Sequence, residues 1–344
     1  DVYKRQVKHQ STEVDVISGA TLSSFAIKDA VVKCIEKAGL DPAKFEKEVP
    51  KPDMLTDTQT LNSDVVIIGG GGAGLSAAVA AAEAGKRVIV LEKNHFLGGN
   101  TSVCGGCYNV ANVGQDDIEM TKGQHDIVKN LLAEKPKNKL HGELIAKTKK
   151  QYDAYLKSGS KKLFDSPELH ALQTWKSGDY QANLELVYTL TQNVGGMVKS
   201  LEGMGFVWRD KATQFVGALW PRSNRALNYK SGVGYIDTFV KYIKEKNLPV
   251  TFYLNTTAND LIVKDGAVVG VKAKNKNGRS YVVNASGGVV LATGGFGANV
   301  EMRNQYDELW NKKLGPTTPT TNLRSATGDG IKLAQQANAG LTQM

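Results

Sequence analysis

The sequence predicts an α/β fold in which a parallel, Rossmann-like sheet carries a helical insertion and a β-meander. A strand, a glycine-rich turn, a helix and a second strand follow one another over residues 64–92. Residues 115–212 are expected to be mostly helical and to fill one face of the sheet. Short apolar runs after residue 250 alternate with turns at Asp265-Gly266 and Asn277-Gly278, as in a β-meander. With 344 residues, 41% of them hydrophobic, the chain is long enough for one large domain and a smaller piece.

Glycines after the first predicted strand indicate a dinucleotide site. Residues 64–68 are mostly apolar and β-branched, as a buried parallel strand requires. Gly69, Gly71 and Gly74 then fill the G-x-G-x-x-G spacing. The first permits a tight turn, the second lets the backbone approach a pyrophosphate, and the third lets the helix pack closely on the strand. The helix predicted over 75–84 points its N–H groups and positive dipole end at the phosphates.

A second strand and an acidic residue complete the pattern. Residues 86–91 return as a strand, and Glu92 at its end is placed to bind ribose hydroxyls. The alternative interpretation is a glycine-rich turn without a ligand. The order of strand, glycines, helix, strand and acid argues against that alternative.

Further motifs resemble a known flavoprotein family. The sequence GGNT stands at 98–101, an apolar strand ends in ATGG at 292–295, and TGDG at 327–330 opens a helix. As a set, over about residues 63–344, these motifs are similar to those of the fumarate reductase and succinate dehydrogenase flavoproteins. The resemblance implies a glutathione-reductase-type domain that binds FAD non-covalently.

The FAD site that this resemblance implies consists of glycine backbone, short polar side chains and a few charged groups. It includes a segment at 255–258, where relatives contact the adenosine half of FAD. The predicted cofactor residues are Gly69, Gly71, Gly72, Ala73, Gly74, Glu92, Lys93, Gly99, Asn100, Thr101, Cys104, Gly105, Gly106, Ala258, Thr293, Gly294 and Asp329.

A second flavin is indicated upstream. Residues 15–21 (DVISGAT) resemble the motif of FMN-binding domains, in which FMN is attached through a phosphoester to the threonine hydroxyl, here Thr21. Such a site needs an exposed hydroxyl beside small residues, so that a separate flavin transferase can reach it. An amphipathic helix is predicted over 23–38, capped by one of its two leading serines. An ordinary turn before a helix is the alternative interpretation.

These landmarks divide the chain into three parts. Residues 1–45 are expected to form the C-terminal part of an FMN-binding domain, 46–62 a polar linker, and 63–344 the FAD-binding domain. The resemblance implies that a capping domain, a proton-donating arginine and a C-terminal FAD segment follow Met344, since none of the five histidines precedes Pro-Thr. The expectation is therefore a fragment without catalytic residues and without activity of its own.

The activity that the resemblance implies is hydride transfer from FAD to the C=C bond of an α,β-unsaturated carboxylate. Fumarate, urocanate or another acrylate would be the substrate, and electrons would reach FAD from an upstream donor through the covalent FMN. A place outside the cytoplasm or at its membrane is implied as well. The candidate substrate residues are Thr321, Asn322 and Arg222, whose guanidinium could pair with a carboxylate. The alternatives are a structural turn at 321–322 and a surface loop anchored by Trp220.

Three other functions remain open at this point. The first is a flavin dehydrogenase or oxidase on the same fold, such as a ketosteroid dehydrogenase or an amino-acid oxidase. The FMN motif argues against it, because an oxidase has no use for a flavin that brings electrons in. The second is a non-catalytic electron carrier, against which the order of the GGNT and later motifs argues. The third is an inactive fragment.

Composition excludes further classes. The formal charge is +9, yet the lysines are mixed with acidic residues and no aromatic stacking pattern accompanies them, so a nucleic-acid partner is not expected. No apolar run approaches the roughly 18 to 20 residues that span a bilayer.

The three cysteines do not form a disulfide framework. Cys104 and Cys107 stand in a C-x-x-C spacing, but Tyr108 follows instead of histidine, which excludes c-type haem attachment. We expect a packing role for this pair, with a redox pair or a chance disulfide as alternatives. No metal site is expected.

Overall fold

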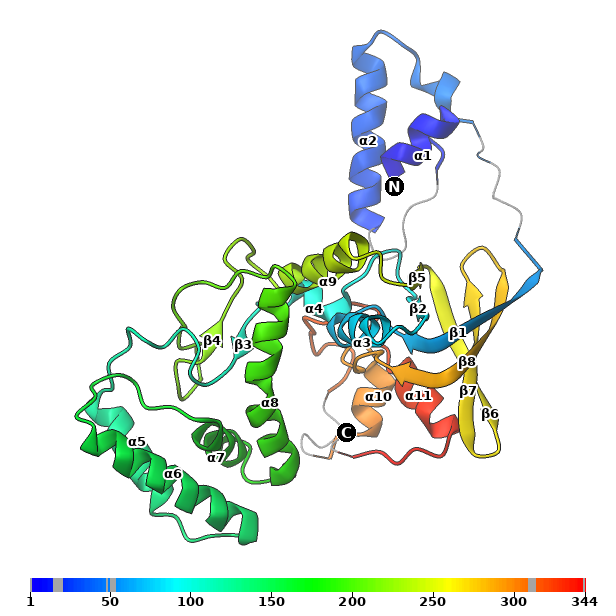
Figure 1. The fold of residues 1–344 in the computed structure, drawn as a ribbon. Coiled ribbons are helices and arrows are strands. Elements are labelled where there is room, and N and C mark those ends of the chain that lie inside the picture. The colour runs from blue at the N-terminus through cyan, green and yellow to red at the C-terminus, as the bar shows by residue number, and fades with distance from the viewer. Residues whose placement is uncertain (1, 15–20, 48, 50–53, 309–313, 343) are drawn as a thin grey trace.

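The computed structural model describes residues 2–14, 21–47, 49, 54–308, 314–342 and 344. Figure 1 shows three parts: a small N-terminal helical unit, a sheet domain, and a lobe of helices that stands beside the sheet domain.

The N-terminal unit holds its helices together with backbone and hydroxyl hydrogen bonds. Thr12 N donates to Phe45 O at 2.8 Å, and Ser11 Oγ donates to Lys47 O at 2.5 Å. The elements of the unit are α1 (Val2–His9), α2 (Thr21–Lys37) and the 3-10 turn η1 (Pro42–Phe45).

The helix predicted over 23–38 is present as α2, but it begins at Thr21. The predicted serine cap is therefore wrong, because both serines lie inside the helix. Gly39 follows the helix with φ +73°, a left-handed conformation suited to a helix end. The rest of the attachment motif, residues 15–20, lies outside the described residues.

The main sheet has six strands in the order β5-β2-β1-β8-β7-β6. Strands β5, β2, β1 and β8 run parallel, while β6, β7 and β8 form an antiparallel meander. The predicted α/β fold is confirmed. The strands are β1 (Thr58–Ile68), β2 (Val88–Leu91), β5 (Val250–Tyr253), β6 (Thr256–Lys264), β7 (Ala267–Asn275) and β8 (Ser280–Leu291).

Strand β8 joins the meander to the parallel sheet. The sequence predicted the last strand of the meander and the apolar strand before ATGG as separate elements, but one strand pairs with β7 near its start and with β1 along its whole length. A register shift between Ser63 and Val65 of β1, opposite the glycine pair 287–288, lets the ladder continue. Because β8 reaches back so far, β1 begins at Thr58, inside the segment predicted as linker.

The meander turns are confirmed. Asp265 and Gly266 both have positive φ, at 51° and 78°, and Gly278 has φ +96°. Such turns match the twist of antiparallel strands.

One layer of helices packs on the sheet around α3 (Gly72–Glu83). Leu75 and Val79 of α3 are buried against Ile236 and Phe239 of α9 and against Leu201 near the end of α8. The other members of this domain are α4 (Gly99–Val103), α9 (Val233–Glu245), α10 (Val300–Gln305), α11 (Asp329–Gln336) and the short pair β3 (Tyr108–Asn109) and β4 (Ser223–Asn224).

The helical insertion does not cover the sheet as expected. Its helices form a lobe with its own core, which includes Leu144, Leu169, Leu172 and Trp175 (Figure 1). Helices that bury their apolar faces against one another do not require the sheet to cover those faces. The helices are α5 (Lys122–Leu132), α6 (Lys139–Lys157), α7 (Pro167–Ser177) and α8 (Leu184–Gly203).

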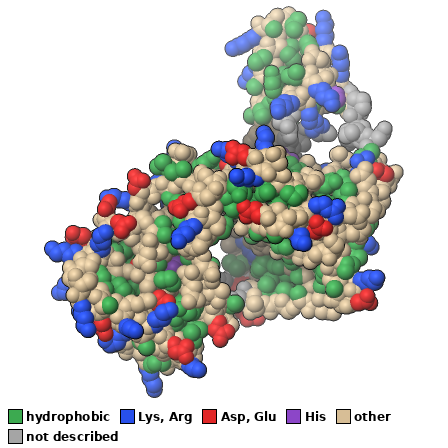
Figure 2. Space-filling view, in the orientation of Figure 1, with side chains coloured by type: hydrophobic (Ala, Val, Ile, Leu, Met, Phe, Trp, Pro, Cys, Tyr) green, Lys and Arg blue, Asp and Glu red, His purple; other side chains and the backbone are tan. Residues whose placement is uncertain are grey.

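The surface carries mixed charge. On the face in Figure 2, basic and acidic side chains alternate over the helical lobe and do not gather into a single basic stripe. Among the helices of the described residues, none is both long and apolar enough to cross a membrane.

Gly74 sets the distance between α3 and β1. A Cβ placed on Gly74 would overlap the carbonyl oxygen of Gly69. Gly74→Ala should therefore lower the free energy of unfolding by about 1–3 kcal/mol, measured by denaturant titration. Gly123→Ala in α5 is the control: no atom lies within 4 Å of its added Cβ, so it should be neutral or stabilise by up to about 1 kcal/mol. Equal effects of the two substitutions would contradict this account.

Candidate functional site

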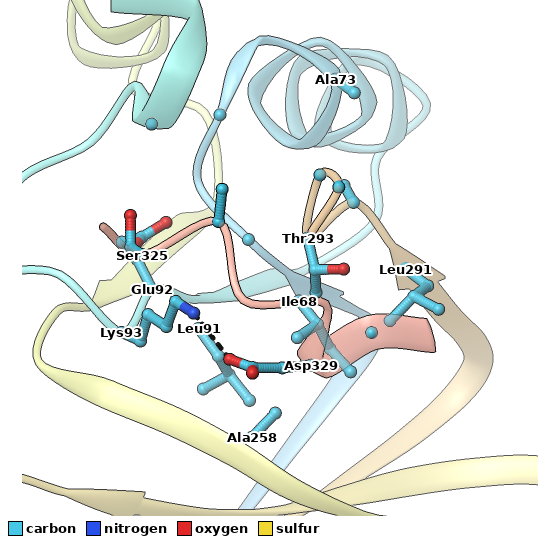
Figure 3. Close-up of a pocket in the computed structure, with 18 of the residues that line it drawn as sticks. Ile68, Ala73, Leu91, Glu92, Lys93, Ala258, Leu291, Thr293, Ser325 and Asp329 are labelled. Carbon is cyan, nitrogen blue, oxygen red and sulfur yellow. Dashed lines mark hydrogen bonds and ion pairs between the residues drawn. The ribbon is translucent and has the colours of Figure 1, made fainter. Parts of the chain in front are cut away.

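A cavity of about 510 Å³ opens where the parallel strands end. Ile68, Leu91 and Leu291, the last residues of β1, β2 and β8, line it, and α3, α4 and α11 border it (Figure 3). Ligands of open α/β sheets bind at this edge. The predicted cofactor residues that line the cavity are Gly69, Gly71, Gly72, Ala73, Glu92, Lys93, Gly99, Asn100, Thr101, Ala258, Thr293, Gly294 and Asp329.

The two glycine loops lie against each other. Gly69 has φ +104°, and a Cβ on it would overlap Ala292 O at the end of β8. Gly71 forms a bridge with Gly98, and Gly72 N donates to Thr101 Oγ1 at 3.2 Å. The G-x-G-x-x-G turn and the GGNT loop thus form one continuous wall of backbone.

The N-terminus of α3 faces this wall. Its N-cap is Gly71, which has no side chain to accept from the first-turn N–H groups. A 12-residue helix that begins this way offers N–H donors and a positive dipole end to an anion. These residues fit a diphosphate.

Glu92 is buried and holds the turn in place. Its Oε2 accepts from Gly70 N at 2.8 Å, and its Oε1 accepts from Asn94 N at 2.8 Å. Each oxygen keeps a second lone pair for a further donor. The predicted contact with a ribose hydroxyl therefore remains compatible with this geometry.

An ion pair joins two segments that are far apart in the sequence, across the cavity. Lys93 Nζ donates to Asp329 Oδ2 at 2.6 Å and to Thr327 Oγ1 at 2.7 Å, and Figure 3 shows Lys93 and Asp329 pointing toward each other. Burial raises the pKa of Asp329, but the hydrogen bonds from Lys93 and Thr327 outweigh it, so this pKa lies below its usual value. The carboxylate therefore stays charged, and the pair fixes the start of α11.

Asn322 lies at the rim of the cavity. Asn100 Nδ2 donates to Asn322 Oδ1 at 2.5 Å, and Leu323 N donates to Asn100 Oδ1 at 2.8 Å. Both asparagines are exposed there, and Thr321 is exposed beside them. The structure thus brings two predicted substrate residues next to the predicted cofactor residue Asn100.

Arg222 is engaged elsewhere, and its predicted contact with a substrate carboxylate needs correction. Its Nε and Nη2 donate to the two oxygens of Asp165 at 2.8 and 2.6 Å, and its Nη1 donates to Gln173 Oε1 at 2.6 Å. The guanidinium is buried between the helical lobe and the β4 segment. A bidentate internal partner leaves this arginine no free edge for a substrate.

Four other predicted cofactor residues do not line the cavity. Gly74 lies behind it, where it permits close packing of α3. Cys104, Gly105 and Gly106 follow the end of α4. Cys104 is exposed and Cys107 is partly buried, and the expected packing role of the cysteine pair stays a prediction.

Sequence reasoning missed some polar residues of the cavity. Asn94 and Ser325 both line it, and Asn94 Nδ2 donates to Ser325 Oγ at 3.3 Å. Asn94 follows Glu92 by two residues at a strand end, and this position could have indicated it. Ser325 has no local signal, because its place depends on the return of the chain after the meander.

Comparisons with known proteins agree with this geometry. Residues 64–140 and 152–344 match the FAD binding domain family, and residues 1–36 match the FMN-binding domain family. The chain belongs to the FAD binding domain family. FAD and FMN are therefore the cofactors of its two domains.

The relatives of this FAD binding domain protein are redox enzymes. It is 36% identical to the NADH:acrylate oxidoreductase of Vibrio harveyi over 97% of this chain and 35% of that protein. It is 31% identical to the urocanate reductase of Eggerthella lenta over 98% of this chain and 48% of that protein. Among solved structures, a flavocytochrome c3 fumarate reductase in its open conformation matches with a TM-score of 0.61 and 28% identity over 80% of this chain and 40% of that chain. The chain thus spans between a third and a half of the length of these relatives.

The buried pair of Asp165 and Arg222 should matter for stability and not for flavin binding. Asp165→Ala leaves the buried guanidinium uncompensated and should lower the free energy of unfolding by about 3–5 kcal/mol. The control Asp57→Ala removes an ion pair to Arg279 that is partly exposed and should cost about 1 kcal/mol or less. Chemical denaturation and FAD titration of the folded fraction measure both effects. Loss of FAD binding without loss of stability in Asp165→Ala would contradict an internal role for this pair.

Proposed function

We propose that the chain forms the FAD-binding part of an enoate reductase, which transfers hydride from FAD to the C=C bond of an α,β-unsaturated carboxylate. The observation that carries this proposal is the continuous sequence similarity of the chain to enoate reductases. Relatives named for acrylate and urocanate match nearly all of the chain, including the FMN-binding segment and the cavity loops. An upstream FMN domain suits an enzyme that must bring electrons to FAD, and no oxidase needs one.

The residues of the chain divide the work of holding the cofactor. When bound, FAD supplies a reducible ring that can deliver hydride to an activated alkene. The glycine loops and the N-terminus of α3 hold the diphosphate, and Glu92 accepts from the ribose. Thr321 and Asn322, at the rim beside Asn100, bind the substrate carboxylate. No residue of this chain is proposed as the proton donor.

The second flavin and the partners form the rest of the proposal. A flavin transferase attaches FMN to Thr21, an upstream donor reduces this FMN, and the FMN passes electrons to FAD. The resemblance of residues 15–21 to attached-FMN motifs supports the attachment of FMN and its role in electron transfer, and it also supports a place outside the cytoplasm or at its membrane.

Attachment at Thr21 is testable by mass spectrometry of the complete gene product, co-expressed with a flavin transferase. The unaltered protein should carry one covalent FMN, and Thr21→Val should carry none because it lacks the hydroxyl that forms the phosphoester. Ser23→Ala, two residues further along α2, is the matched control and should keep the FMN. Covalent FMN on Thr21→Val would place the attachment elsewhere.

The reaction is testable with the complete gene product under anaerobic conditions. Reduced viologen should be oxidised when acrylate, fumarate or urocanate is added, and not when the saturated acid propionate is added, because only the enoates accept hydride. Gly71→Val should abolish this turnover, since its side chain would stand in the path of the diphosphate, while Gly123→Ala should keep it. A protein that holds FAD but oxidises viologen with none of a broad set of enoates would contradict the proposed function.

A further inference from the structure

Two cysteines stand beside the cavity without a role in the proposed reaction. Cys104 follows α4 directly, and α4 carries Asn100 and Thr101 of the cavity wall. Both Cys104 and Cys107 are free thiols; Cys104 is exposed and Cys107 is partly buried. An oxidant in solution can therefore reach this pair.

Each sulfur accepts a hydrogen bond. Gly106 N donates to Cys104 Sγ at 3.4 Å, and Arg225 Nε donates to Cys107 Sγ at 3.1 Å. Both sulfurs of the pair therefore have a hydrogen-bond donor directed at them.

The charge of Arg225 is available to Cys107. Within the described part of the chain, this guanidinium forms no ion pair with a carboxylate, and it lies over the ring of Phe215, 5.4 Å from the centroid. Arg222 differs in this respect, because its guanidinium donates to both carboxylate oxygens of Asp165. Arg225 therefore directs its Nε–H at Cys107 Sγ without a competing ion pair in the described part of the chain.

The segment between the sulfurs is small. Gly105 and Gly106 separate the cysteines, and a Cβ on Gly105 would meet no atom within 4 Å. Gly106 adopts φ +69°, and Tyr235 OH donates to its carbonyl oxygen at 3.0 Å. A disulfide requires its two Cβ atoms to approach within about 3.5–4.5 Å, and the spacer places no side chain between the cysteines, with open surroundings at Gly105.

We propose that Cys104 and Cys107 form a redox-active dithiol that closes to a disulfide in the presence of a low-molecular-weight disulfide. The exposed Cys104 attacks the oxidant, forms a mixed disulfide and releases one small thiol. The Cys107 thiolate, held by Arg225, then attacks Cys104 Sγ and releases the second small thiol. In sum, two protein thiols give up two electrons and two protons, and the oxidant disulfide becomes two thiols.

Closure of the disulfide changes the cofactor loop. In the dithiol, Cys104 Sγ donates to Thr101 O at 3.1 Å, and Thr101 in turn accepts from Gly72 N. Oxidation removes the first of these hydrogen bonds. The site therefore links the redox state of the surroundings to a loop of the FAD cavity, whichever substrate the enzyme reduces.

The test is oxidation of the purified chain with oxidised glutathione, followed by thiol counting and peptide mass mapping. Cys34, which is exposed in α2, is replaced by serine so that only Cys104 and Cys107 can react. In Cys34→Ser, both remaining thiols should disappear together, and a peptide that links Cys104 to Cys107 should appear. In Cys34→Ser/Cys104→Ser, Cys107 should instead carry glutathione. Separate glutathione adducts on both cysteines of Cys34→Ser, or two thiols that do not react, would overturn the proposal.

The role of Arg225 has its own readout. Arg225→Gln removes the donor to Cys107 Sγ and should slow disulfide closure several-fold, whereas Arg225→Lys should keep most of the rate. Equal rates of disulfide closure in the unaltered chain and in Arg225→Gln would contradict the proposed contact. Far-UV circular dichroism confirms that each variant is folded.

Discussion

The buried carboxylate of Glu92 is the interaction on which the cavity depends. It accepts one hydrogen bond from the glycine turn at Gly70 and one from Asn94, the start of the loop that leads to GGNT. The backbone of Glu92 also bonds to Tyr253 and Thr256, so β5 and β6 meet the same residue. A charge-assisted hydrogen bond in a buried place is strong, and its loss leaves unpaired polar groups. One residue, through its side chain and its backbone, therefore fixes the turn, the second loop and the meander relative to one another.

The rest of the cavity is closed by contacts between distant parts of the chain. Lys93 meets Asp329, and Asn100 meets Asn322, each across more than two hundred residues of sequence. Strand β8 makes these contacts possible, because it carries the chain from the meander back to the centre of the parallel sheet. The helical lobe between these segments has its own core.

The sequence predicted those features that rest on local spacing. The roles of Gly69, Gly71 and Gly74 follow from backbone geometry within a few residues, and so do the meander turns. Glu92 could be predicted as well, because its position at the end of a strand is part of the same local pattern.

Features that depend on long-range packing could not be predicted in this way. The continuity of β8 requires a partner strand more than two hundred residues away, and the separate core of the lobe depends on how its helices meet. Arg222 is the clearest case. Nothing near it in the sequence indicates Asp165, and the sequence does not show whether an arginine has an internal partner. Arg225, three residues later, turns toward a cysteine instead.

The most direct test of this account is competition for FAD on the flavin-free protein, followed by flavin fluorescence. One FAD should bind per chain and be displaced by ADP, because we propose that the glycine turn, Glu92 and the start of β6 bind the adenosine diphosphate half. FMN, which lacks that half, should displace FAD poorly. Displacement of FAD by FMN as readily as by ADP, or no binding of FAD, would contradict the account.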